Sequence, residues 1–238
     1  MLKLFLLSLT EEQIEKQTDA AQIITMATLA LLVIAGGILS GFFRDKNREG
    51  TRVTAFAAVS IALSFALSFI KFTPVPYGGS VTAASLLPLL LFSFAYGPVK
   101  GLLAGLIYGL LQFLQSPYFL TPIQFVLDYL LAFGAIALAG VLRPAFKKDS
   151  SALFAGIALA GAVRFLFHFA AGFIFVTHGQ VWANLPLVGY GENSAPALYS
   201  LIYNLVYLVP DLLIVFIAAI YLAASKNLER ILGILKKH

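Results

Sequence analysis

The sequence contains no cysteine, and this absence excludes a disulfide framework and a thiolate metal site. Charge is scarce as well, since Asp, Glu, Lys and Arg together make up 11% of the 238 residues. Soluble domains carry about 25% charged residues. Hydrophobic residues reach 60%, and no stretch is polar enough for a soluble domain. The composition therefore predicts an all-α protein that crosses the membrane several times.

Several sequence motifs that indicate catalysis are also missing. The chain has no G-x-x-x-x-G-K-[ST], no H-E-x-x-H and no G-x-S-x-G, and its three histidines are scattered. These absences favour binding or transport over catalysis. A membrane enzyme that uses Asp128 and His168 as acid and base is the least favoured alternative. The net charge of +5 does not indicate nucleic-acid binding, because the basic residues form short clusters between apolar segments.

Seven apolar stretches have lengths typical of membrane-spanning helices. They are residues 21–43, 54–72, 82–96, 99–116, 121–142, 151–177 and 198–224. We interpret the first as an additional helix beside a six-helix core. The expected organisation is an N-terminal segment with this helix and a basic linker (1–50), a substrate-binding membrane domain (51–225) and a basic cytoplasmic tail (226–238).

The distribution of basic residues predicts the orientation of these spans. Lys and Arg gather after the first, third, fifth and seventh spans, whereas the loops 115–121 and 177–197 contain neither residue. Basic residues mark cytoplasmic loops. We therefore expect an N-terminus outside the cell membrane and a C-terminus in the cytoplasm.

Polar residues on three different spans are expected at a similar depth. Counting about 1.5 Å per helical residue from the outer ends, Asp128, His168 and Asn204 lie roughly 9–13 Å deep. This arrangement predicts a cavity that opens outward. Three tyrosines are expected at similar levels: Tyr129, Tyr199 and Tyr203.

Asp128 has no lysine or arginine at its own depth, and ionisable residues inside spans are usually functional. A cationic ligand would supply the missing charge. Two structural alternatives stay open: a protonated Asp128 that is hydrogen-bonded to a neighbouring helix, and a His168 that serves only packing. Arg164 and Asp211 lie about 20 Å deep, where we predict an ion pair between them. His168 follows Arg164 by one helical turn, so both lie on one side of their helix.

Two patterns of small residues indicate close helix packing. Gly101, Gly105 and Gly109 have the G-x-x-x-G spacing that permits helices to approach closely, and packing within the chain is the favoured interpretation. The second span carries a stripe of small residues at Ala58, Ala62 and Ala66.

Four segments resemble the thiamin-specific substrate-binding subunits of energy-coupling factor (ECF) transporters. They are "GGSVTAASLLPLLLFSFAYGPVKGLLAGLIYGLLQ", "PIQFVLDYLLAFGAIALAGVLR", "VRFLFHFAAGFIF" and "YSLIYNLVYLVP". The resemblance covers residues 52–224 and six spans in the same order. It implies a subunit that captures thiamin from outside with high affinity, has no cofactor, and works with a membrane scaffold subunit and two cytoplasmic ATPases.

The resemblance also implies a set of binding residues. An acidic residue followed by tyrosine matches Asp128 and Tyr129, and a tyrosine and an asparagine five apart match Tyr199 and Asn204. The family also has a basic residue, a histidine four positions later and a glycine four positions after that. These match Arg164, His168 and Gly172. Thiamin suits these groups, because its thiazolium is cationic and its aminopyrimidine needs hydrogen bonds and stacking partners. The alternative ligand is another cationic or pyrimidine-type small molecule.

The sequence departs from the family at two binding positions. Some members have glutamate where this chain has Asp128, and some have tryptophan where it has Val176. Trp182 or Tyr77 is expected to supply the missing ring. In this family the small-residue stripe docks the scaffold subunit, which makes Ala58 and Ala62 candidate interface residues.

Overall fold

The computed structural model describes residues 48–119, 121–177, 184–185, 189–190 and 195–236. These residues belong to one unit of the chain, 43–238. The additional span predicted at 21–43 and the candidate ring of Trp182 lie outside the described residues.

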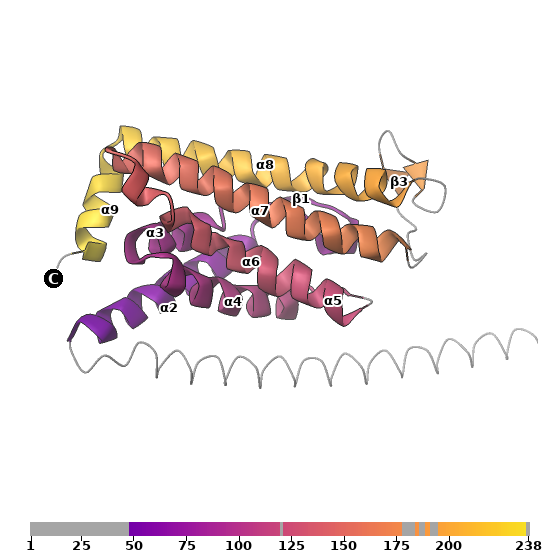
Figure 1. Cartoon of the computed structure of the whole chain (residues 1–238), viewed down its shortest axis with the longest axis horizontal. Helices are drawn as coiled ribbons and strands as arrows, with labels where there is room; N and C mark the ends of the chain where they lie inside the picture. Colours follow the sequence, from indigo (N-terminus) through magenta and orange to yellow (C-terminus); the bar gives the residue numbers. More distant parts are fainter. Residues whose placement is uncertain (1–47, 120, 178–183, 186–188, 191–194, 237–238) are drawn as a thin grey trace, which may run out of the picture. The chain divides into compact units, whose positions relative to one another are not determined.

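Six helical segments form the core of the described part, and they follow the order predicted from the sequence (Figure 1). Four of them contain stretches long and apolar enough to cross a membrane: Gly50–Ser68, Pro122–Ala145, Asp149–Thr177 and Pro196–Ala224. The remaining two have 10 and 18 residues. The all-helical membrane fold is thus confirmed. The six segments are α2 (Arg48–Ser68), α3 (Leu87–Tyr96), α4 (Pro98–Gln115), the segmented helix from α5 (Pro122–Phe125) to η3 (Ala135–Gly140), α7 (Asp149–Thr177) and α8 (Pro196–Ala224).

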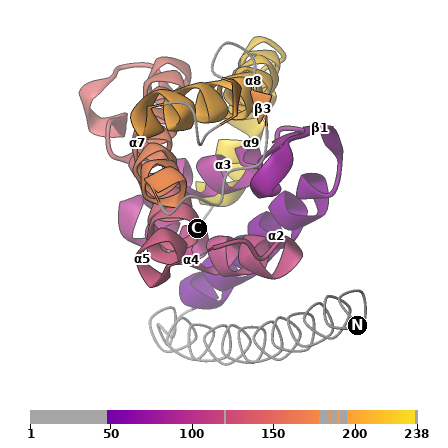
Figure 2. The same ribbon diagram turned by 90° about the vertical axis from the view of Figure 1, so that its right-hand side faces the viewer.

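The core helices lie in two groups. Helices α7 and α8 run side by side, and α4 lies along α6 on the opposite side (Figures 1 and 2). Aromatic and aliphatic side chains of α3, α4 and α7 are fully buried, as Phe92, Phe113 and Leu153 illustrate. Apolar side chains on α8, such as Ile217 and Leu213, stay exposed, as expected for a surface that faces lipid.

A short antiparallel hairpin replaces the helical ends predicted around residues 69–86. Strand β1 (Lys71–Pro74) pairs with β2 (Ser80–Thr82), and a 3₁₀ turn, η1 (Pro76–Gly78), connects them. The predicted span 54–72 therefore ends at Ser68, and the span 82–96 begins as a helix only at Leu87. Prolines and glycines between the two strands prevent a continuous helix, because proline lacks the N–H group that the helix needs.

The fourth core helix is not a regular α-helix. After α5 it contains a π-helical segment, η2 (Val126–Leu131), then α6 (Ala132–Gly134) and the 3₁₀ segment η3. Single π-helical turns inside α-helices occur frequently at functional sites. This one carries Asp128 and Tyr129.

The glycine stripe of α4 packs against this irregular helix. A Cβ atom on Gly109 would lie 1.9 Å from the carbonyl oxygen of Tyr129, and one on Gly105 would lie 2.3 Å from that of Phe133. Any side chain at these positions would push the two backbones apart. The packing role predicted for the glycines is confirmed, and it determines where η2 lies relative to α4.

The C-terminal residues form a helix that the sequence analysis missed. Helix α9 (Asn227–Lys236) buries Leu228 and Leu232, and the Tyr96 hydroxyl donates a 2.6 Å hydrogen bond to the Leu235 carbonyl. The many basic residues in this segment suggested a solvated tail. Its apolar residues lie four positions apart, and this spacing would have indicated an amphipathic helix. The remaining described elements are η4 (Arg143–Ala145), β3 (Asn184–Leu185) and β4 (Gly189–Tyr190).

Candidate functional site

A cavity lies between the hairpin, α4, the segmented fourth helix, α7 and α8. Polar and aromatic side chains from all five elements line it. The eight predicted binding residues within the described part all contribute: Tyr77, Asp128, Tyr129, Arg164, His168, Gly172, Tyr199 and Asn204. The residues that the depth calculation placed at one level all line this cavity: Asp128, Tyr129, His168, Tyr199, Tyr203 and Asn204.

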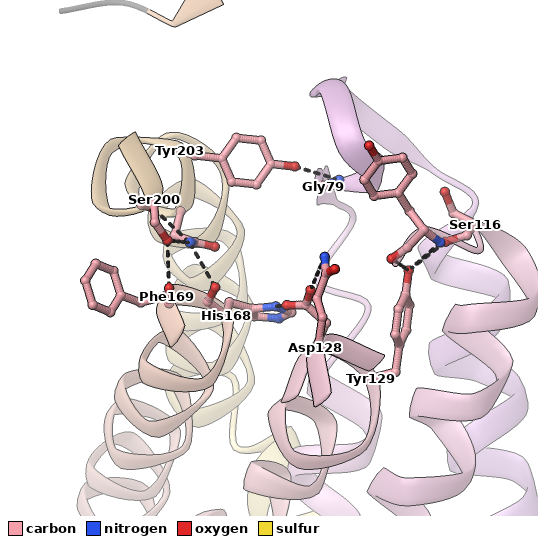
Figure 3. A network of polar contacts seen from close by, with 11 residues as sticks. Gly79, Ser116, Asp128, Tyr129, His168, Phe169, Ser200 and Tyr203 are labelled. Carbon is pink, nitrogen blue, oxygen red and sulfur yellow. Dashed lines mark hydrogen bonds and ion pairs between the residues drawn. The ribbon is translucent and has the colours of Figure 1, made fainter. Parts of the chain in front are cut away.

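The side chains of Asp128 and His168 contact each other on the wall of the cavity. Asp128 Oδ1 lies 2.7 Å from His168 Nδ1, and Gln124 Nε2 lies 3.5 Å from Asp128 Oδ2 (Figure 3). The sequence placed the two side chains at one depth without pairing them. The π-helical turn explains the geometry, because it shifts the direction in which Asp128 leaves the helix axis. Asp128 lines the cavity and keeps 22% of its side-chain surface exposed, so part of this side chain stays accessible.

The pairing defines what His168 offers to a ligand. A carboxylate can only accept, so the proton on Nδ1 is donated to Asp128. In the neutral imidazole, Nε2 is then an acceptor, and it is buried without a hydrogen-bond partner among the described residues. The rings of Phe133 and Tyr207 stand edge-on to the imidazole at centroid distances of 6.3 and 6.2 Å. The ring is therefore held in place with one nitrogen free for a donor.

Asn204 holds α7 and α8 together. Its side-chain nitrogen donates to the carbonyl oxygens of Ser200 at 2.8 Å and His168 at 3.3 Å. Ser200 adds a 2.7 Å hydrogen bond to the Phe169 carbonyl (Figure 3). Gly172 permits this close approach, since a Cβ there would lie 2.4 Å from Ser200 Oγ. Asn204 and Gly172 therefore shape the cavity through helix packing.

Tyr129 uses its hydroxyl to order the loop after α4. The hydroxyl donates to the Ser116 carbonyl at 2.8 Å and accepts from the Tyr118 N–H at 3.1 Å (Figure 3). Its ring packs edge-on against Phe113 with centroids 5.0 Å apart. Tyr129 thereby positions Tyr118, a cavity-lining ring that the sequence analysis did not single out.

Aromatic rings also line the cavity. Tyr77 lies 4.9 Å from Phe175, 5.6 Å from Tyr118 and 6.0 Å from Tyr203, measured between ring centroids. Tyr77 has a left-handed backbone (φ 61°), which is uncommon outside glycine and often marks a functional site. It also packs against the cluster that contains Val176. Tyr77 thus lies beside Val176, and its role as the replacement for the family tryptophan stays a prediction.

The predicted ion pair between Arg164 and Asp211 is confirmed. Arg164 Nη1 lies 3.3 Å from Asp211 Oδ2, and both side chains are largely buried. The other carboxylate oxygen of Asp211 accepts from the Thr82 N–H at 2.9 Å and the Thr82 hydroxyl at 2.7 Å. The pair therefore also fastens β2 to α8. The Arg164 guanidinium lies 5.0 Å from the centre of the Phe133 ring, a cation–π contact.

Sequence reasoning missed several cavity-lining residues because they are neutral. Gln112, Gln115 and Gln124 line the cavity, and the side-chain nitrogen of Gln112 is buried without a hydrogen-bond partner among the described residues. Amide side chains inside apolar spans, spaced three residues apart on one helix, were the signal that could have identified them. The analysis counted ionisable groups and passed over these.

The small-residue stripe of α2 lies on its outer surface. Ala58 and Ala62 are exposed, whereas Val53 and Ala57 face the core. Exposed alanines leave a smooth, shallow helix face, as close helix–helix packing in membranes requires.

Comparisons with known proteins identify the family of the chain. The family model described as "Thiamine transporter protein (Thia_YuaJ)" matches residues 54–230. The thiamine transporter ThiT of Bacillus subtilis is 30% identical over 183 residues, which cover 72% of this chain and 91% of the relative. ThiT of Lacticaseibacillus paracasei is 26% identical over 167 residues, 63% of this chain and 81% of the relative.

A solved structure shares the fold. ThiT from Listeria monocytogenes superposes with a TM-score of 0.54 and 23% identity, covering 74% of this chain and 96% of the other. The sequence relatives are named as transporters, which agrees with the expectation of a protein that is not an enzyme. The resemblance inferred from the four segments is confirmed, and the chain belongs to the thiamine transporter protein family.

Proposed function

We propose that the protein is the thiamin-capturing subunit of an ECF-type importer. The observation that carries this proposal is the Asp128–His168 pair, which places a carboxylate and an unpartnered imidazole nitrogen on one cavity wall. A neutral histidine beside an ionised aspartate leaves one net negative charge. That charge suits a ligand with a fixed cation and a hydrogen-bond donor nearby.

Thiamin has both features. Its thiazolium would lie against the accessible part of the Asp128 side chain, and the amino group of its pyrimidine would donate to His168 Nε2. The rings of Tyr77, Tyr118 and Tyr203 offer aromatic faces for the cation and the pyrimidine. Membrane burial strengthens the attraction, because charges interact more strongly at low dielectric constant. Arg164 would act mainly through its ion pair with Asp211.

Transport itself would need other proteins. The cavity would open to the outside, with the N-terminus outside and the C-terminus in the cytoplasm, as the basic loops predict. A scaffold subunit in the membrane and two cytoplasmic ATPases would supply the energy, because the chain has no nucleotide-binding loop motif. ATP hydrolysis in these partners would reorient the whole subunit and release thiamin inside.

Equilibrium binding tests the ligand assignment. Purified full-length protein in detergent should bind thiamin in titration calorimetry with one site and leave it chemically unchanged. The separate pyrimidine and thiazolium halves should bind far more weakly, because each engages one part of the cavity only. A different organic cation that binds more tightly than thiamin would favour the alternative ligand class instead.

The exposed alanines of α2 give a prediction about the scaffold partner. Replacing Ala62 by tryptophan should greatly reduce copurification of the scaffold subunit and ATPases from cells that express all components. The large ring would hold the two helices apart. Thiamin binding should stay unchanged, since Ala62 does not line the cavity.

The matched control is Ile217→Trp, which puts the same ring on an exposed apolar position of α8. That variant should copurify normally. An Ala62→Trp complex that assembles as well as the control would rule out docking through this stripe.

A further inference from the structure

The α4 wall of the cavity carries polar groups that the proposed function has not used. Gln112 and Gln115 lie one turn apart and line the cavity opposite His168 and Asn204, which come from α7 and α8. Gln112 Nε2 is shielded from solvent and has no hydrogen-bond partner among the described residues. A buried amide N–H without a partner is costly, so this group calls for a hydrogen-bond acceptor from outside the chain.

Gln115 is oriented by a neighbour on α2. One atom of its side-chain amide lies 3.1 Å from Ser68 Oγ, and Ser68 Oγ also lies 2.6 Å from the Phe65 carbonyl oxygen. A hydroxyl has one proton, and a carbonyl can only accept, so the shorter contact takes that proton. Ser68 Oγ is then an acceptor for Gln115. The hydrogen-bond network therefore assigns the amide nitrogen of Gln115, and not its oxygen, to the position next to Ser68 Oγ. The nitrogen of Gln115 then donates to Ser68, and its oxygen is the buried atom left without a partner among the described residues.

The α4 wall therefore presents one donor, Gln112 Nε2, and one acceptor, the Gln115 oxygen. A group that matches both must donate and accept at once. An alcohol does so, whereas a methyl group does neither and an ether or ester oxygen only accepts.

We infer that Gln112 and Gln115 form a hydroxyl-recognition subsite that binds the terminal alcohol of the ligand. The inference rests on the proposed function, in which thiamin carries a hydroxyethyl group on its thiazolium. With the thiazolium at Asp128 and the aminopyrimidine at the α7–α8 wall, the hydroxyethyl arm is the remaining polar part. The α4 wall is the remaining wall with unpartnered polar atoms among the described lining residues.

The test compares thiamin with an analogue in which an ethyl group replaces the hydroxyethyl group. Titration calorimetry on the wild-type full chain should show the analogue binding about tenfold or more weakly, since sites built for a hydroxyl reject ligands that lack it. Gln112→Met should weaken thiamin binding by a similar factor and leave the analogue's affinity unchanged. The unchanged affinity for the analogue also shows that the variant is folded.

Each other outcome has a defined meaning. Equal wild-type affinities for thiamin and the analogue would overturn the subsite without any variant. Equal weakening of both ligands by Gln112→Met would also overturn it, and the proposed function would stand. Failure of the wild-type protein to bind thiamin would contradict the proposed function itself. Should Gln112→Met not fold, Gln115→Met gives the same comparison.

Discussion

Replacing Asp128 by asparagine should weaken thiamin binding by at least about tenfold while the protein stays folded. Asparagine keeps an oxygen that can accept from His168 Nδ1, so the local hydrogen bond at 2.7 Å has a substitute. Only the negative charge is removed. The thiazolium would then enter a site with no counter-charge, and its lost hydration would be poorly compensated. Calorimetry and thermal melting on the same preparation separate binding from folding.

Two further variants make this experiment specific. Asp149→Asn removes a carboxylate that pairs with Arg143 away from the cavity, and it should leave thiamin affinity unchanged. Asp128→Glu restores the charge with a longer side chain and should bind much better than Asp128→Asn. An Asp128→Asn protein with wild-type affinity would contradict the counter-ion role.

Removing the charge of Asp211 should produce the largest loss of stability. Asp211→Asn keeps an oxygen for Thr82 but leaves Arg164 buried without its counter-ion. Breaking a buried ion pair from one side costs about 3–5 kcal/mol. The free energy of unfolding should fall by this amount, and the melting temperature of the purified protein should fall with it.

A double-mutant cycle shows whether the two groups act together. Arg164→Met combined with Asp211→Asn should be more stable than Asp211→Asn alone, because no unpaired charge is left inside. The control is again Asp149→Asn, where the ion pair is more exposed and should contribute about 0–1 kcal/mol. Additive effects of the Arg164 and Asp211 substitutions would indicate that the contact does not stabilise the fold.

The sequence predicted the site better than it predicted the elements that carry it. Residue depth depends on the helical rise and the span ends alone, so Asp128, His168 and Asn204 could be brought together by counting. The same counting placed Arg164 beside Asp211, and the structure confirms that contact. The ends of a span, and so the depth of each residue in it, can be estimated from the hydrophobicity of that span alone.

The remaining features depend on contacts between distant segments. The hairpin at 71–82 is held by Asp211 and by the Tyr203 hydroxyl, which accepts from the Gly79 N–H. Hydrophobicity along the chain cannot reveal such distant partners. For this reason the predicted spans 54–72 and 82–96 extended into the hairpin. The π-helical turn at Asp128 depends likewise on the backbone of α4, since Gly109 fits against Tyr129. Tertiary packing overrides local helix propensity at this site.

The hydrogen bonds of Tyr129 and Asn204 have a consequence for how affinity arises. Both side chains are expected to favour ligand binding, yet the Tyr129 hydroxyl and the Asn204 side-chain nitrogen are already hydrogen-bonded within the protein. Their contribution is then preorganisation: the walls are rigid before the ligand arrives, so binding does not have to order them. Lower affinity after substitution of either residue would reflect a looser empty cavity, and would not by itself be evidence that the side chain touches thiamin.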